Sequence, residues 1–339
     1  MKVLVTGATG FIGSHVVAQL LRGGHEVGIL ARNLDKQKAV LEKLSVPHRA
    51  VALHPGDVLD DSWRALLPQY EALVHCAGMM SKSVTDVQKM WELNVSGSER
   101  ILRGAAAAGL DPIIFLSSFT ALFPPGGPVM HADDPVTEPD SSYARTKARA
   151  EHNARQLQAE GAPVVCIYPA SVNGPIDPTV GSGQEFLANY VNSGSMLVTQ
   201  GGLTFTDVRD LALLVNRLLE PGRGLRRIMA SADFIPHAEI LRIMREQTGK
   251  PIRAMKVPGW LLRSLGRLAD LRQRLFGEPT PDLTYEAAAV LTRCVPQDDA
   301  EARALLGDDL IGGEQSLRDM ADWMLAEGII QSGAPQGRL

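Results

Sequence analysis

The sequence has few cysteines and no strong excess of charge of either sign. Only three of its 339 residues are cysteines, Cys76, Cys166 and Cys294, and they lie far apart without CxxC or metal-ligand spacing. This pattern excludes a disulfide framework, gives no sign of a metal site, and favours a reducing compartment. A formal net charge of -4 at pH 7 gives no electrostatic reason to bind nucleic acid.

Long apolar runs are also missing. None approaches the roughly 18 residues that a membrane-spanning helix needs. The first apolar strand begins at Lys2, which leaves no room for a signal peptide ahead of it. We therefore expect a cytoplasmic protein.

Short runs of branched apolar residues alternate with segments of helical periodicity through the first half of the chain. The apolar runs are VLVT at 3–6, EVGIL at 26–30, LVHCA at 73–77, IIFLSS at 113–118 and VVCIYP at 164–169. The segments with a helical pattern include 14–22, 87–108 and 143–159. This alternation predicts an α/β protein with a doubly wound parallel sheet, the Rossmann architecture, because each strand returns through a right-handed crossover helix.

The alternation loosens after Pro169 and becomes mostly helical from about Phe234. We expect a dinucleotide-binding domain over 1–169, to which 203–232 returns. A smaller, mostly helical substrate lobe is expected over 170–202 and 233–330, with a flexible tail over 331–339. Asp210 is expected to cap the apolar helix that follows it.

Three glycines stand three residues apart in MKVLVTGATGFIGSH. Gly7 ends the strand where a side chain would strain the turn, Gly10 lets the backbone approach a ligand, and Gly13 lets the helix pack on the strand. The helix N-terminus then offers N–H groups and a positive dipole end to a pyrophosphate. The predicted cofactor contacts in this loop are Gly7, Thr9, Gly10, Phe11, Ile12 and Gly13.

The second strand, EVGILAR, ends in Ala31-Arg32-Asn33. An acidic residue about 20 positions after the glycines would bind the ribose 2′-OH of NAD. The guanidinium of Arg32 suits a 2′-phosphate instead, so we expect NADP, with NAD as the alternative because Asp35 lies nearby.

The stretch SSYARTK places Tyr143 and Lys147 four residues apart, about one helical turn, so both side chains share one face. An ammonium close to the phenol, in a site closed by a cofactor, would lower the pKa of Tyr143 from its usual value of about 10. Tyr143 would then exchange a proton near neutral pH. The alternative is a chance pair on a helix surface.

Taken together, these motifs resemble the short-chain dehydrogenase/reductase superfamily, in its extended branch, the NAD(P)-dependent epimerase/dehydratase family. Further pieces follow in the family's order over about the first 215 residues: GDVLD at 56–60, VHCAG at 74–78, NVSG at 94–97, FLSS at 115–118, YPASVNGP at 168–175 and FTDVRDLA at 205–212. So many sequence stretches in the order of the family's motifs are not expected by chance.

The resemblance implies roles for individual residues. Asp57 and Val58 would lie by the adenine, and Ala77, Gly78 and Pro169 would also line the cofactor. Lys147 would hold the nicotinamide ribose.

For the reaction itself, the resemblance implies that Tyr143 exchanges a proton with the substrate and that Asn94 maintains the proton path. Ser118 would hydrogen-bond the substrate oxygen, with Ser117 as its rival. The residues after Ser118 are Phe119-Thr120-Ala121-Leu122, not the Asp-Glu pair of the sugar-nucleotide dehydratases, which disfavours dehydration.

Hydride transfer to a carbonyl, or from a secondary alcohol, is therefore the expected activity. A sugar-nucleotide epimerase is the alternative, and Arg32 and Tyr168, which replaces the arginine of RPxxVYGP, argue against it. The chain looks closer to dihydroflavonol-reductase-like and 3β-hydroxysteroid-dehydrogenase-like members. A regulator that only senses NADP is an alternative of another class, although such relatives generally lose the tyrosine–lysine pair.

Apolar residues near the expected pocket suit a hydrophobic substrate, or simply cover the core. They are Met79, Met80, Phe119, Phe123 and Met130. Residues 257–277 repeat leucine at helical spacing between arginines, and we expect this helix to pack on its own lobe, with lipid contact as the less favoured alternative. A homodimer is common among members of the family.

Overall fold

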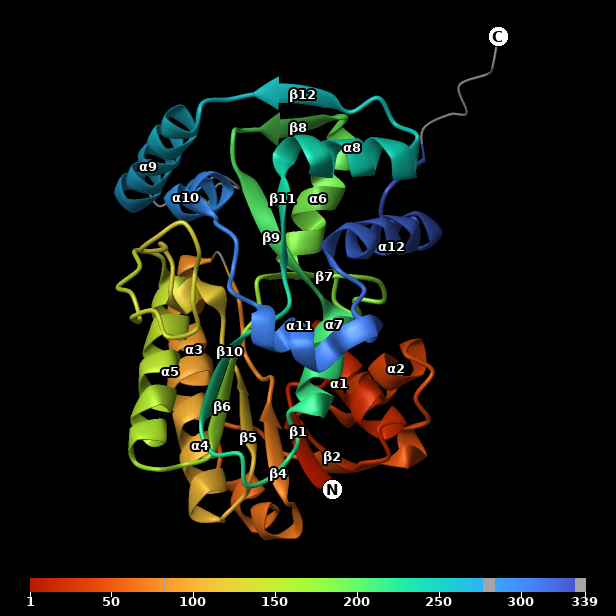
Figure 1. The fold of residues 1–339 in the computed structure, drawn as a ribbon, viewed down its shortest axis with the longest axis vertical. Coiled ribbons are helices and arrows are strands. Elements are labelled where there is room, and N and C mark those ends of the chain that lie inside the picture. Colours follow the sequence, from red (N-terminus) through yellow and green to blue (C-terminus); the bar gives the residue numbers. More distant parts are fainter. Residues whose placement is uncertain (82, 277–283, 333–339) are drawn as a thin grey trace.

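The computed structural model describes residues 1–81, 83–276 and 284–332, and Figure 1 shows them as two stacked lobes. The lower lobe is built on a seven-stranded parallel sheet in the order β10-β6-β5-β4-β1-β2-β3. Its strands are β1 (Lys2–Thr6), β2 (Glu26–Ala31), β3 (Val51–Pro55), β4 (Ala72–His75), β5 (Ile113–Leu116), β6 (Val164–Tyr168) and β10 (Arg226–Met229). The strand order reverses between β1 and β4, which is where doubly wound sheets bind ligands.

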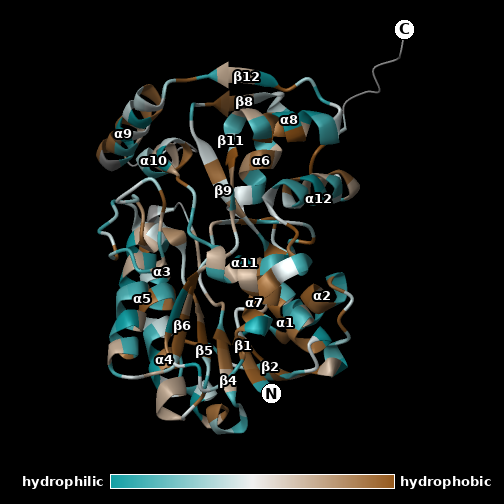
Figure 2. Cartoon of the chain, viewed as in Figure 1, coloured by the Kyte–Doolittle hydropathy of each residue, from teal (hydrophilic) through white to brown (hydrophobic). Residues whose placement is uncertain are grey.

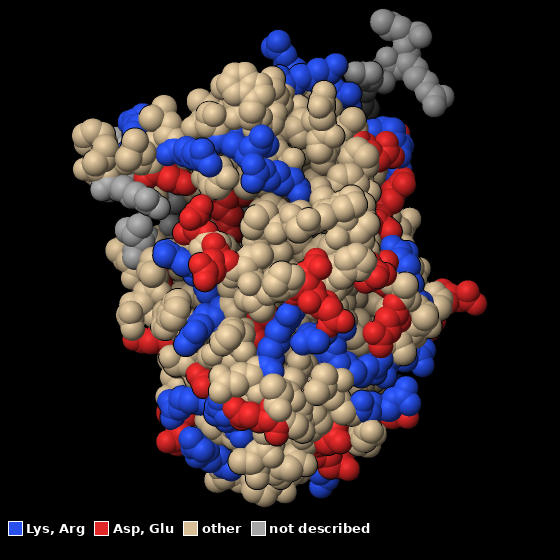
Figure 3. All heavy atoms as spheres, turned by 60° about the vertical axis from the view of Figure 1, so that its left-hand side comes forward, with Lys and Arg blue, Asp and Glu red and all other residues tan. Residues whose placement is uncertain are grey.

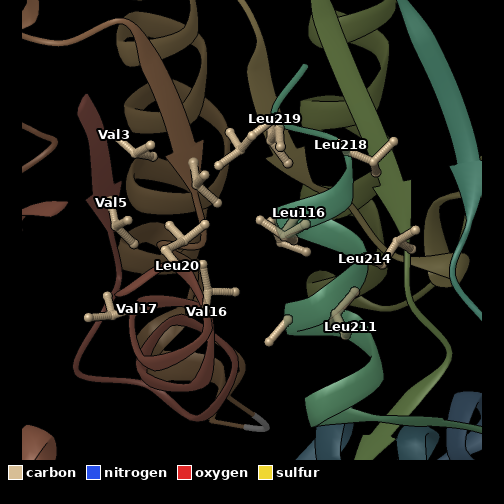
Figure 4. Close-up of a cluster of buried hydrophobic side chains, with 14 of the residues drawn as sticks. Val3, Val5, Val16, Val17, Leu20, Leu116, Leu211, Leu214, Leu218 and Leu219 are labelled. Carbon is tan, nitrogen blue, oxygen red and sulfur yellow. The ribbon is translucent and has the colours of Figure 1, made fainter. Parts of the chain in front are cut away.

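Helices cover both faces of this sheet, as predicted. One face carries α1 (Phe11–Arg22), α2 (Leu34–Lys43), α7 (Val208–Arg217) and α11 (Ala300–Leu306). The other carries α3 (Val87–Trp91), a π-helical turn (Glu92–Gly97), α4 (Ser98–Ala107) and α5 (Ser142–Ala159). Because side chains alternate along a strand, Val3 and Val5 join the first core while Leu4 joins the second. Figure 4 shows Val3 and Val5 in the first core with leucines of α1 and α7.

The upper lobe is mostly helical and encloses a third core. Its helices are α6 (Ser182–Ser193), α8 (His237–Thr248), α9 (Gly259–Phe276), α10 (Tyr285–Arg293) and α12 (Gly313–Ala326). Its strands form two small sheets, one of β7 (Ser171–Asn173), β9 (Gly202–Asp207) and β11 (Asp233–Pro236), the other of β8 (Ser195–Val198) and β12 (Arg253–Lys256). Figure 2 shows that hydrophobic residues concentrate in the strands of the large sheet, whereas the helices around it mix hydrophobic and hydrophilic residues.

Short 3₁₀ turns complete the described elements. They span His48–Ala50, Ser62–Ala65, Leu67–Gln69, Val84–Asp86, Phe119–Ala121 and Gly307–Asp309. None of the described helices combines the length and apolar character needed to cross a bilayer.

The chain passes between the lobes more often than the sequence suggests. Helix α7 packs on α1 and strand β10 pairs with β6, but β9 pairs with β7 and β11 of the upper lobe. Helix α11 packs on α7, although the substrate lobe was expected to extend over it. Of the expected tail, residues 333–339 lie outside the described residues. The division into two domains therefore stays a prediction.

Asp210 does not cap its helix, so that prediction is wrong. Helix α7 begins at Val208, before Asp210. Its N-cap is Asp207, which accepts from the backbone N–H of Arg209 at 2.7 Å. Asp210 lies in the first turn and accepts from the backbone N–H groups of Ile311 and Gly312 at 3.0 and 3.1 Å. It therefore ties α7 to the segment ahead of α12.

Candidate active site

The loop between β1 and α1 forms a tight turn around its glycines. Gly7 has a φ of +73°, and a Cβ there would lie 2.5 Å from the backbone nitrogen of Ala77. A Cβ at Gly13 would lie 2.4 Å from the carbonyl oxygen of Gly7. At Gly10, by contrast, the nearest atom to a Cβ is that same oxygen, at an ordinary 3.4 Å. Packing within the chain thus requires glycine at 7 and 13, whereas at 10 only the approach of a ligand would require it.

The N-terminus of α1 fits an anionic group. The helix begins at Phe11, and no side chain caps it. The N–H groups of its first turn, including those of Phe11 and Ile12, point out of the helix end with the positive end of the dipole. Together with the half-buried Thr9 and Gly10, they form a cradle that fits the pyrophosphate of a dinucleotide.

Arg32 lies at the end of β2 with 64% of its side chain exposed, and its guanidinium is 3.4 Å from Asp57 Oδ2. Asp57 also accepts from the N–H of Leu59, and the next residue, Val58, is buried. Asp35 is the acidic residue that kept NAD as an alternative cofactor. It forms an ion pair with Lys38, and 94% of its side chain is exposed. The guanidinium of Arg32 is therefore accessible to a ligand, and a phosphate can displace its ion-pair partner, Asp57.

The residues that follow β4 lie at the same edge of the sheet as the glycine loop. Ala77 is half-buried and Gly78 is exposed. Asn94 is buried in the π-helical turn, where it accepts from the N–H of Met79 at 2.7 Å. Its amide nitrogen donates to the Met79 carbonyl and to Thr146 Oγ1, which lies beside Lys147 in α5. Asn94 thus ties the end of β4 to the helix that carries the tyrosine and lysine.

The two serines after β5 point to different partners. Ser117 donates to the buried carboxylate of Glu151 at 2.6 Å. Ser118 Oγ accepts from the backbone N–H and the hydroxyl of Thr120, and Ser118 lies close enough to the phenol of Tyr143 to lower the pKa of that phenol. Pro169, at the end of β6, accepts from the N–H of Phe119 and so holds this loop at the sheet edge.

Tyr143 lies in the first turn of α5, whose N-terminus is capped by Ser141. Burial raises the pKa of Tyr143 to about 12, the negative charge of Glu286 adds to the increase, and the hydrogen bond from Ser118 opposes it. The expected lowering of this pKa concerns a site closed by a cofactor, so it stays a prediction. A phenol with this pKa is a proton donor at neutral pH.

Lys147 shares the helix face of Tyr143 but reaches a different partner. Its Nζ donates to the carbonyl of Leu116 at 3.0 Å and lies 5.2 Å from the centre of the Phe115 ring. Burial lowers the pKa of Lys147 to about 8, and the charge of Glu151 partly offsets this. The ammonium is thus held against the end of β5, which is why it does not lower the pKa of Tyr143.

A cavity of about 520 Å³ opens beside Tyr143 between the two lobes. Most of its lining is apolar, contributed by Phe119, Val172, Phe186, Leu187, Leu203, Phe205, Val290, Leu291 and Met320. Of the apolar residues singled out in the sequence, Phe119 and Met80 line this cavity, whereas Phe123 and Met130 belong to the core of the lower lobe.

The sequence analysis missed a carboxylate in this cavity. Glu286, from α10, hydrogen-bonds Ser141, the residue that caps α5. Burial raises the pKa of Glu286, and the charge of Asp270 from α9 adds to the increase. Asp270 accepts from the N–H of Tyr285 and so fixes α10 to α9. No local motif marks Glu286, because it reaches Tyr143 only through the packing of the two lobes.

A family model for the NAD dependent epimerase/dehydratase family matches residues 3–227, and the chain belongs to this family. It is an NAD(P)-dependent enzyme of the extended short-chain dehydrogenase/reductase type, which confirms the predicted class.

Three comparisons illustrate its similarity to other proteins. The chain is 29% identical over 336 residues to Sterol demethylase protein B of Methylococcus capsulatus, across 97% of this chain and 100% of that protein. It is 28% identical over 257 residues to cinnamoyl-CoA reductase 1 of Oryza sativa subsp. japonica, across 72% of this chain and 75% of that protein. The solved structure of gox2253 matches with a TM-score of 0.79 at 25% identity, across 97% of this chain and 99% of that chain.

Proposed function

We propose that the enzyme transfers hydride between NADP(H) and a carbonyl or secondary alcohol of a hydrophobic small molecule, with Tyr143 as the proton donor and acceptor. The observation that carries this proposal is the closeness of the Ser118 hydroxyl to the phenol of Tyr143, which lines an apolar cavity. These two hydroxyls are the pair that a carbonyl oxygen needs as negative charge develops on it.

In the direction of reduction, a bound NADPH would supply the hydride for the carbonyl carbon. Ser118 donates a hydrogen bond to the substrate oxygen, and Tyr143 transfers its proton to that oxygen. Lys147, held at the end of β5 by its hydrogen bond to the Leu116 carbonyl, would bind the nicotinamide ribose. Asn94 hydrogen-bonds both the segment after β4 and α5, and so keeps these groups in position.

The dinucleotide contacts proposed for the cofactor follow the crevice from β3 to β6. The residues that would hold the pyrophosphate are Gly7, Thr9, Gly10, Phe11, Ile12 and Gly13, and those that would hold the adenine end are Arg32, Asp57 and Val58. The nicotinamide end would be held by Ala77, Gly78, Tyr143, Lys147 and Pro169. Gly10 supports this path, because nothing else in the chain needs a glycine there.

Arg32 is the basis of the proposed NADP preference. The Arg32→Ala variant is expected to bind NADPH about 10- to 100-fold more weakly, because a charge-assisted hydrogen bond to the 2′-phosphate is lost. Its affinity for NADH should change little, and fluorescence titration with both cofactors measures the difference. Arg22→Ala, an exposed arginine at the far end of α1, is the matched control. An unchanged preference in Arg32→Ala would remove this residue from the cofactor site.

The substrate class follows from the cavity. Its apolar walls and its size, about 520 Å³, suit a hydrophobic molecule, and the similarity to a sterol demethylase protein points to a sterol-like alcohol or ketone. Among the described residues that line it, Asp140, Asp270 and Glu286 are acidic and only Arg145 is basic. A sugar nucleotide carries a pyrophosphate, which needs cations around it, so this lining disfavours the epimerase alternative.

Glu286 is expected to set the pH dependence of alcohol oxidation. That direction needs the phenolate of Tyr143, and the negative charge of Glu286 opposes its formation. In Glu286→Gln this repulsion is gone, so the pKa of Tyr143 falls and the rise of the oxidation rate with pH moves to lower pH. The pH profile of kcat measures the shift. Asp140→Asn, which removes an exposed carboxylate at the same cavity, should leave the profile in place, and a shift to higher pH in Glu286→Gln would contradict the assignment.

A substrate screen tests the proposed function as a whole. NADPH consumption is followed with sterol ketones, aromatic ketones, aliphatic aldehydes and UDP-sugars, each with NADH in parallel. We expect turnover with a hydrophobic ketone and NADPH. Conversion of a UDP-sugar without net change in the cofactor would replace the proposal with the epimerase alternative.

A further inference from the structure

Helix α9 exposes a row of large apolar side chains. Trp260, Leu261, Leu265, Leu268, Leu271, Leu275 and Phe276 are between 36% and 71% exposed. Figure 1 places this helix at the outer edge of the upper lobe. The helix packs on α10 of its own lobe, as expected, but most of its leucines lie on the exposed side. Gly277, the last residue of the predicted segment, lies outside the described residues.

The exposed row and the packed face are opposite sides of one helix. On the packed face, Leu262 is buried, and a Cβ at Gly266 would lie 2.7 Å from the carbonyl oxygen of Thr284, so α9 rests closely on the start of α10. The exposed leucines follow one another at spacings of four, three, three and four residues, from Leu261 to Leu275. This spacing keeps them on a single face.

The same segment is strongly basic. Residues 250–276 contain seven lysines and arginines and one acidic residue, Asp270, within a chain whose net charge is -4. Arg253 and Lys256, both exposed, lie on β12 directly before the helix, and Arg267 is exposed on α9. Asp270 is turned toward α10, where it accepts from Tyr285. Figure 3 shows basic side chains gathered across the upper lobe.

We propose that α9 and β12 dock the protein on the surface of an anionic lipid bilayer. The apolar row enters the boundary between headgroups and acyl chains, and the basic side chains meet the lipid phosphates, as in an interfacial amphipathic helix. This contact is peripheral, with the helix lying along the surface.

Charge complementarity favours a bilayer over a second copy of the chain. A symmetric contact through α9 would bring the same basic segment of both copies together, and the like charges would repel. An anionic surface, by contrast, attracts the exposed cations of this segment, such as Arg253 and Lys256. The docked orientation also places the cavity beside the bilayer, because Asp270 and Gln273 of the same helix line it.

Vesicle co-sedimentation of the full chain tests the proposal. We expect the protein to pellet with vesicles that contain phosphatidylglycerol, more weakly with phosphatidylcholine alone, and less as salt is added. The double variant Leu268→Gln, Leu271→Gln should bind about tenfold more weakly or worse, because two apolar side chains no longer enter the lipid. Arg253→Gln with Lys256→Gln should weaken binding to the anionic vesicles only.

The control is Leu225→Gln, which changes an equally exposed leucine outside this surface and should bind like the unmodified chain. Equal sedimentation of the leucine variant and the unmodified chain would overturn the proposal. It would also fail if the unmodified chain ignored vesicles but formed a dimer that Leu268→Gln, Leu271→Gln dissociates. Sedimentation reads no turnover, so the result does not depend on the proposed reaction.

Discussion

Replacing Tyr143 with phenylalanine is expected to lower turnover by a factor of about 10² to 10⁴, the usual contribution of a positioned general acid. The change removes a single oxygen and keeps the ring that lines the cavity. In the proposed reaction that oxygen carries the proton for the substrate, and its pKa of about 12 keeps it protonated throughout the neutral range. Affinity for NADPH should stay within a few fold, because the pyrophosphate cradle and Arg32 are untouched. Steady-state rates and fluorescence titration measure the two quantities separately.

Tyr285→Phe is the matched control for this prediction. Tyr285 lines the same cavity, and its ring lies under the guanidinium of Arg267. Loss of its hydroxyl should leave most of the activity in place, because it does not contact Ser118. Full activity in Tyr143→Phe would refute the proposed chemistry. Equal losses in both variants would show that the effect comes from the shape of the cavity instead.

The elements that the sequence predicts well are those whose cause is local. Gly7 needs a positive φ, and Gly13 must let α1 approach the backbone of Gly7 closely. Both requirements involve only a few residues of backbone, so the spacing of the glycines predicts them. The alternation of apolar strands and helices likewise predicts the parallel sheet. Tyr143 and Lys147 are predicted to share a face because helical geometry alone determines it.

The direction of a side chain is harder to predict, as the two serines after β5 show. Ser117 and Ser118 are neighbours with the same hydroxyl, yet one binds Glu151 and the other meets Tyr143. Which of them faces the cavity depends on where the helices lie relative to the strand. Lys147 shows the same limit, because its partner, the Leu116 carbonyl, lies on another element.

Contacts between the lobes leave no mark in the sequence. Glu286 affects the pKa of a tyrosine 143 positions before it, and the two come together because Glu286 reaches Ser141, the N-cap residue of α5. Helix α9 shows the complementary limit. Its periodicity predicts an apolar face, but both faces hold leucine, so the sequence does not tell which one packs on α10.

Gly10→Ala is expected to abolish most cofactor binding while leaving the fold almost unchanged. A Cβ at this residue meets only the Gly7 oxygen, at 3.4 Å, so the chain itself accommodates it. The weaker capping by alanine and the stiffer unfolded chain offset each other, to within about 1 kcal/mol in the free energy of unfolding. The added methyl group occupies the space in which the pyrophosphate must approach the backbone, so the affinity for NADPH should fall about tenfold or more.

Gly13→Ala separates this effect from general damage to the turn. There the Cβ would lie 2.4 Å from a backbone oxygen, and neither α1 nor β1 can move away without disturbing the core of the lower lobe. The free energy of unfolding should therefore fall by about 1–3 kcal/mol, together with cofactor affinity. Thermal denaturation and NADPH titration of the two variants give the comparison. Normal NADPH binding in Gly10→Ala would show that no dinucleotide lies against this glycine, and a loss of stability as large as that of Gly13→Ala would show that the chain itself requires it.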